Sequence, residues 1–68
     1  MYKRVWYFKV NVKGFDTRVF VYGTEEEAQE YMKWEFGYLP GYTGATEQEE
    51  AAARLLGMKI YLAPEVKH

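Results

Sequence analysis

The chain contains no cysteine, and its only histidine is His68 at the last position. A disulfide framework and a cysteine-based zinc site are therefore excluded, and one histidine cannot hold a metal ion by itself. No stretch approaches the roughly 20 apolar residues of a membrane span. The apolar run after Tyr2-Lys3-Arg4 is too short for a signal-peptide core, so we expect a cytoplasmic protein with a native start at Met1 and no membrane contact.

Catalytic motifs are also missing, because no glycine-rich phosphate loop, nucleophile arrangement or metal-ligand spacing occurs. The glutamates occupy polar helix positions without a His, Cys or Lys partner in a predictable cleft. We therefore predict that the protein is not an enzyme and has no cofactor, no metal and no small-molecule substrate. Glu35 with Tyr31 or Tyr38 is the one pair to examine, and only if two protomers form a cleft.

Aromatic residues are abundant for a chain of 68 residues, which is long enough for one domain, residues 1–68. Two Trp, four Phe and seven Tyr exceed what so small a core needs. Some must lie at the surface, where tyrosine is favoured in binding sites. The alternative interpretation, which stays open, is that tyrosines rim the core with their hydroxyl groups in water.

The net charge of -1 hides a segregation of charge along the chain. Residues 1–23 hold five basic side chains and one acid, whereas residues 24–50 hold eight glutamates and one lysine. Residues 51–68 are again mildly basic. We expect a molecule that is basic on its sheet and acidic on its helices.

Two β-rich runs, 5–12 and 17–22, predict a hairpin with Gly14 and Phe15 as its two-residue turn. This register places Lys13 opposite Asp16. Alternate side chains then fall on opposite faces. The predicted core face contains Trp6, Phe8, Val10, Val12, Val19 and Val21, and the other face contains Val5, Tyr7, Lys9, Asn11, Arg18, Phe20 and Tyr22.

Two capping boxes, at Thr24 and Thr46, predict helices that end at Gly37 and Gly57. Their predicted inward sets are Ala28, Tyr31, Met32 and Phe36 in the first helix, and Gln48, Ala51, Ala52, Leu55 and Leu56 in the second. Glu50 and Arg54 are expected to form an ion pair. Residues 38–44 between the helices are expected to be a loop, with a tight Pro-Gly turn and positive φ at Gly41, that either covers the core or contacts a partner.

Residues 58–63 predict a last strand, with Met58, Ile60 and Leu62 inward and Lys59 and Tyr61 outward. The predicted fold is a small α+β domain of order β-β-α-α-β. Its three-stranded sheet has the first strand in the centre and both helices on the Trp6/Phe8/Val10 face. The direction of the last strand stays open.

This arrangement leaves an aromatic and basic sheet face for binding. We predict a non-enzymatic module that contacts a partner protein, or a second copy of itself, as a small regulator or inhibitor of a larger protein. The alternative is single-stranded nucleic acid, with bases stacked on the aromatic rings, although the chain is acidic overall and lacks an RNA-recognition signature. The predicted partner-binding residues are Tyr7, Lys9, Arg18, Phe20, Tyr22, Lys59 and Tyr61 on the sheet, with Tyr38 and Tyr42 in the loop.

In size and in its lack of motifs, the chain resembles the small accessory proteins of phages and mobile elements. Some of these inhibit a larger host protein by binding to it. The resemblance is one of type and rests on no particular residues, so it adds only to the expectation of a protein binder.

Overall fold

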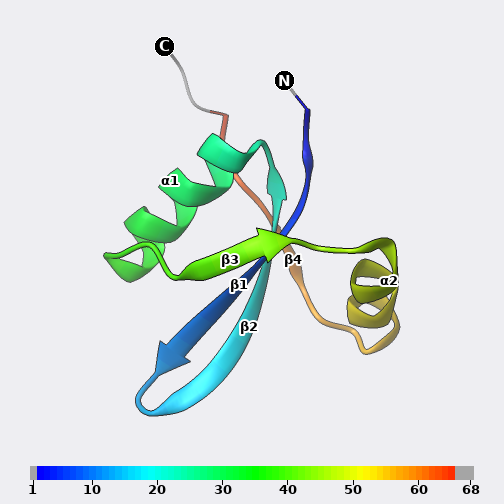
Figure 1. The fold of residues 1–68 in the computed structure, drawn as a ribbon, viewed down its shortest axis with the longest axis horizontal. Helices are drawn as coiled ribbons and strands as arrows, with labels where there is room; N and C mark the ends of the chain where they lie inside the picture. Colours follow the sequence, from blue (N-terminus) through cyan, green and yellow to red (C-terminus); the bar gives the residue numbers. More distant parts are fainter. Residues whose placement is uncertain (1, 66–68) are drawn as a thin grey trace.

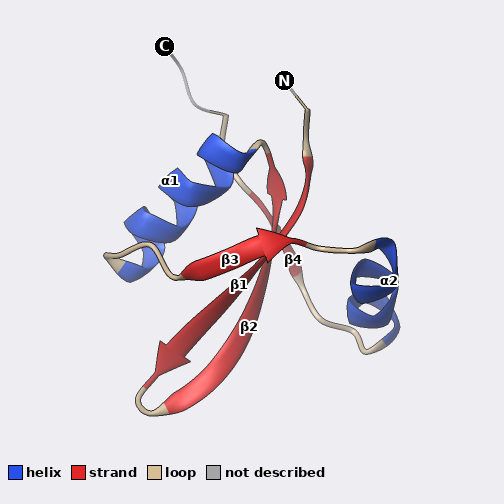
Figure 2. Cartoon of the chain, in the orientation of Figure 1, coloured by secondary structure: helices blue, strands red, loops and turns tan. Residues whose placement is uncertain are grey.

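The computed structural model describes residues 2–65, so that Met1 and His68 lie outside it. Within this range, the elements are β1 (Arg4–Val12), β2 (Phe15–Gly23), α1 (Glu25–Phe36), β3 (Gly41–Gly44), α2 (Glu47–Leu55) and β4 (Ile60–Leu62) (Figure 1). The strands form one sheet in the order β3-β1-β2-β4 (Figure 2). The α+β class is confirmed, whereas the prediction of three strands in the order β-β-α-α-β is wrong.

The hairpin of β1 and β2 turns at Lys13 and Gly14, whose φ angles are 51° and 87°. Val12 therefore pairs with Phe15, and the predicted turn at Gly14-Phe15 is wrong. The Asn11 side chain supports the turn by accepting a hydrogen bond of 3.1 Å from the Gly14 amide. The register differs from the predicted one by two residues. Because side chains alternate with a period of two, the predicted division into faces is unchanged.

The first core lies on the predicted side of the hairpin. Phe8, Val10 and Val21 are buried there against Ala28 and Met32 of α1. The helix has the predicted Thr24 capping box and ends at Gly37 in a left-handed conformation, with φ 79°. Its predicted bounds and inward residues Ala28 and Met32 are confirmed. Val12 and Phe36, also predicted inward, are exposed.

A second core lies on the opposite face of the sheet. Val5, Tyr7 and Phe20 are buried there with Ala45 and Ala53, and Met58 and Ile60 pack against them. The prediction that both helices share one face is therefore wrong. β3 and β4 occupy opposite edges of the sheet, so the chain between them must cross a face. Since α1 already covers one face, α2 and its flanking residues cross the other.

Residues 41–44, predicted as a loop, form the edge strand β3, which pairs antiparallel with β1. Gly41 sits in this strand and does not take the predicted positive φ. This segment was expected either to cover the core or to contact a partner. Tyr42 covers the core, because its ring centroid lies 5.1 Å from that of Phe8 and 5.9 Å from that of Trp6. Tyr38 remains exposed.

The last strand, β4, runs parallel to β2 and does not flank β1 as predicted. Ile60 points to the second core, so the predicted packing of this strand on the α1 side is wrong. Tyr61 lies on the α1 face and stacks on Tyr31, with ring centroids 6.1 Å apart. Leu62, predicted inward, is 76% exposed.

Candidate functional site

The sheet face predicted to bind a partner is largely covered. Tyr7 and Phe20, its central aromatics, are only 8% and 4% exposed, because residues 45, 53, 58 and 60 pack over them. The expectation that these two rings are free is wrong. The remaining predicted residues are scattered: Lys9, Arg18 and Tyr22 stay exposed beside the second core, Lys59 lies over the ring of Tyr61 on the other face, and Tyr42 packs against the first core.

The exposed cations of this face lie near the hairpin turn. Lys9 and Arg18 are register partners on β1 and β2. The Arg18 guanidinium carbon lies 5.9 Å from the centroid of Tyr7, so it covers the rim of a ring that is already buried. A shallow cleft of about 340 Å³ here is lined by Tyr7, Lys9, Asp16, Thr17 and Arg18. Its charge is mixed, and no exposed ring faces it.

The clearest unexpected surface is the outer side of α2. Among its residues only Ala53 is buried. The predicted inward set is exposed instead, and Leu55 and Leu56 are 89% and 76% exposed. We define the α2 stripe as Ala51, Ala52, Leu55 and Leu56.

The orientation of α2 follows from its two ends. Before the helix, the Ala45 amide donates to the Val5 carbonyl at 3.0 Å, and the Arg4 guanidinium donates to the Ala45 carbonyl at 2.9 Å. After it, the Met58 amide donates to the Ala53 carbonyl at 2.9 Å. The first two bonds join the start of α2 to β1, the third caps the helix itself, and Ala53 and Met58 pack into the second core, so the stripe lies outside. The predicted capping box at Thr46 and the Glu50–Arg54 ion pair of 2.9 Å are confirmed.

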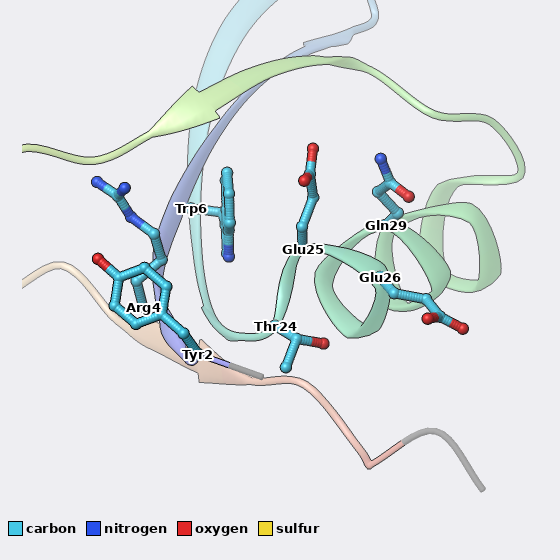
Figure 3. A pocket seen from close by; sticks show the side chains of 7 residues that line it. All are labelled: Tyr2, Arg4, Trp6, Thr24, Glu25, Glu26 and Gln29. Carbon is cyan, nitrogen blue, oxygen red and sulfur yellow. The ribbon is translucent and has the colours of Figure 1, made fainter. Parts of the chain in front are cut away.

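A cleft of about 610 Å³ separates the start of β1 from the first turns of α1. Figure 3 shows Arg4 and Tyr2 on one side of the Trp6 ring and Glu25, Glu26 and Gln29 on the other. The Arg4 guanidinium carbon lies 5.3 Å from the Trp6 ring centroid, and the Trp6 indole N–H donates to the Gly23 carbonyl at 3.0 Å. The cleft therefore has one basic and one acidic wall.

The acidic wall is tied to the edge strand. The Tyr42 hydroxyl donates to Glu25 Oε2 at 2.6 Å and accepts a hydrogen bond from Gln29. Its hydrogen bond to Glu25 raises the pKa of Tyr42, with a smaller upward contribution from burial, because ionisation would place two negative charges side by side. Arg4, Trp6, Glu25 and Gln29 are thus engaged within the protein itself, which leaves few polar groups for a ligand.

The pair considered for an enzyme, Glu35 and Tyr31, is placed within electrostatic reach. Burial raises the pKa of Tyr31, and the charges of Glu35 and Tyr61 raise it further. Glu35 is exposed, as expected at the end of the helix. In residues 2–65 no group of three His, Asp or Glu side chains could hold a metal ion. In the same range no helix has the length and apolarity to cross a membrane.

The α2 stripe could not be identified as a surface from its sequence. The spacing of Ala51, Ala52, Leu55 and Leu56 indicates an apolar side of a helix, and such a side is normally buried in the domain. Only the positions of Ala53 and of the two flanking segments reveal that it faces solvent. Comparison with protein-family models, curated protein sequences and solved structures finds no match to this chain.

Proposed function

We propose that this protein is a non-enzymatic protein-binding module whose partner contacts the α2 stripe, in place of the strand face expected from the sequence. The observation that supports this is the exposure of Leu55 and Leu56, at 89% and 76%, on a helix whose only buried residue is Ala53. The apolar pattern of α2 predicts that this side of the helix is buried, whereas the fold exposes it to water. Such conflicts are expected at functional surfaces.

The occupant that fits is an apolar groove on a larger protein, with a basic rim. A groove contacts a helix on several sides, and small residues such as Ala51 and Ala52 allow it to approach closely. The basic rim is inferred from Glu47, Glu49 and Glu50 in the first turn of α2, which carry negative charge to one end of the stripe. Binding in this way would allow so small a domain to regulate or inhibit its partner.

A second copy fits the stripe less well. A helix of nine residues is only about 14 Å long, and two of them in contact cover one side of each other. That area falls well below the roughly 800 Å² per partner of a standard stable interface. The nucleic-acid alternative loses its support for another reason: Tyr7 and Phe20, the rings that would stack on bases, are covered.

The test places a photoreactive amino acid at position 55 and, as a control, at position 15. Phe15 is 76% exposed beside the hairpin turn and Leu55 is 89% exposed, so both probes reach solvent. In an extract of the cells that produce the protein, we expect a covalent adduct with another protein from position 55 but not from position 15. Leu56→Glu in the same chain should abolish it.

Three outcomes would overturn the proposal. Adducts of equal yield from both positions, or none from position 55, would show that the stripe does not bind. A self-adduct together with a doubled mass by light scattering would assign the stripe to a second copy and reject a different partner.

A further inference from the structure

A small cleft is lined by residues of α1 and of the segment that follows β4. Figure 1 shows α1 and α2 on opposite sides of the molecule. One wall is a single face of α1, because positions 27, 30, 31 and 34 follow helical spacing. The other wall is Pro64 and Glu65. The volume of about 250 Å³ is below the roughly 300 to 1,000 Å³ of pockets that enclose whole small molecules. It suits one long side chain.

The aromatic lining favours a cation. Trp34 is 81% exposed, so almost the whole indole is open to an incoming group, and Tyr31 lies one turn before it. Elsewhere the chain pairs rings with its own cations: Arg4 lies 5.3 Å from the Trp6 centroid, and Lys59 lies 4.9 Å from that of Tyr61. Among residues 2–65, no cation of the protein lies over Trp34. An indole face is the ring that attracts a cation most strongly.

The charges around the cleft also favour a cation. Glu27, Glu30 and Glu65 line it, and Glu35 acts on the Tyr31 hydroxyl from the next turn. Lys3 Nζ lies 3.9 Å from Glu27 and 3.6 Å from Glu65, and Lys33 lies 3.4 Å from Glu30. The position of Lys3 shows that carboxylates beside this cleft hold an ammonium group. Glu35 adds a further carboxylate, which forms no ion pair with any residue from 2 to 65.

We propose that this cleft binds a lysine or arginine side chain from a basic segment of a partner protein. The aliphatic part of the side chain packs between Tyr31 and Pro64, and its cationic end lies over Trp34 within reach of Glu30. Apolar walls with a charged rim suit such a chain, whose stem is apolar and whose end is charged. The site is independent of the α2 stripe, and either can fail without the other.

The test uses nitrogen-labelled protein titrated with acetyl-arginine amide and acetyl-lysine amide, followed by NMR. Acetyl-citrulline amide is the matched probe, because it keeps the shape of arginine and lacks its charge. We expect saturable shifts of the Trp34 indole N–H and the Tyr31 amide with the two cations and none with citrulline. Trp34→Ala should weaken binding about two- to fivefold, in line with the strength of an exposed cation–π contact.

Matched variants distinguish binding in the cleft from nonspecific electrostatic attraction of cations to the protein surface. Glu30→Gln should weaken binding, whereas Glu47→Gln, which removes the same charge from the exposed start of α2, should leave it unchanged. Trp34 and Glu30 are both exposed, so these variants should keep the folded spectrum. Equal shifts with citrulline, equal effects of the two glutamine variants, or shifts untouched by Trp34→Ala would each overturn the proposal.

Discussion

Tyr7 and Phe20 meet edge to face across β1 and β2, with ring centroids 5.3 Å apart and planes at 80°. They are register partners in the middle of the hairpin, and Ala45 and Ala53 lie over them. Such pairs add about 0.5 to 1.5 kcal/mol beyond the burial of their area. The sheet therefore has a core on each face, and the surface that we propose for partner binding lies elsewhere.

Phe8→Ala and Phe20→Ala should both destabilise the protein, each by about 3 to 5 kcal/mol, because each removes a buried ring. Phe8 is 0% and Phe20 is 4% exposed. On the sequence model alone, Phe20 faces solvent and its loss should be tolerated. Urea denaturation followed by circular dichroism measures the difference. Phe15→Ala, at a position 76% exposed, is the control and should change stability little. A Phe20→Ala protein as stable as this control would refute the second core.

Leu55→Glu with Leu56→Glu should leave the free energy of unfolding within about 1 kcal/mol of the wild type, because both side chains are already in water. Ala53→Glu should unfold the domain or destabilise it severely, since Ala53 is 2% exposed and would bury an unpaired charge. Thermal melts of the three proteins make the comparison. If the Leu55/Leu56 double variant were the less stable of the two, α2 would have to be rotated about its axis relative to this structure.

Lys13→Asn should stabilise the hairpin by up to about 1 kcal/mol, because lysine is strained at its φ of 51° and asparagine tolerates this conformation. Gly14→Ala should destabilise it, since φ at Gly14 is 87°. If the turn were instead at Gly14-Phe15, Lys13→Asn should not increase the stability of the protein. Denaturation midpoints of both variants therefore decide between the two registers.

The stability of the protein should fall above about pH 10, because the pKa values of Tyr31 and Tyr42 are raised in the folded state. The unfolded chain then loses these protons first, so alkali favours unfolding until the folded tyrosines also ionise. Tyr42→Phe should flatten this dependence and cost up to about 1 kcal/mol at neutral pH through the lost bond to Glu25. Urea midpoints measured from pH 8 to 11 test this. An unchanged slope in the variant would contradict the role of the Tyr42–Glu25 bond.

Local patterns account for much of this fold. The Thr24 and Thr46 capping boxes and the glycines at 37 and 57 mark the helices correctly, because these signals act within a few residues. Alternation along the hairpin sorted its faces correctly even though the turn was misplaced by one residue. β3 was missed because a four-residue edge strand with glycine at each end carries almost no strand signal of its own.

Long-range packing sets the rest, above all the side of the sheet on which α2 lies and the side of α2 that faces outward. An apolar pattern such as that of Ala51, Ala52, Leu55 and Leu56 states that one side of a helix avoids water, but it does not state what covers that side. Here the chain crosses the sheet from β3 to β4, the Ala45 amide bonds to β1, and Ala53 and Met58 pack into the second core. The same packing buries Tyr7 and Phe20 and leaves the α2 stripe exposed, because a nine-residue helix can present only one side to the sheet.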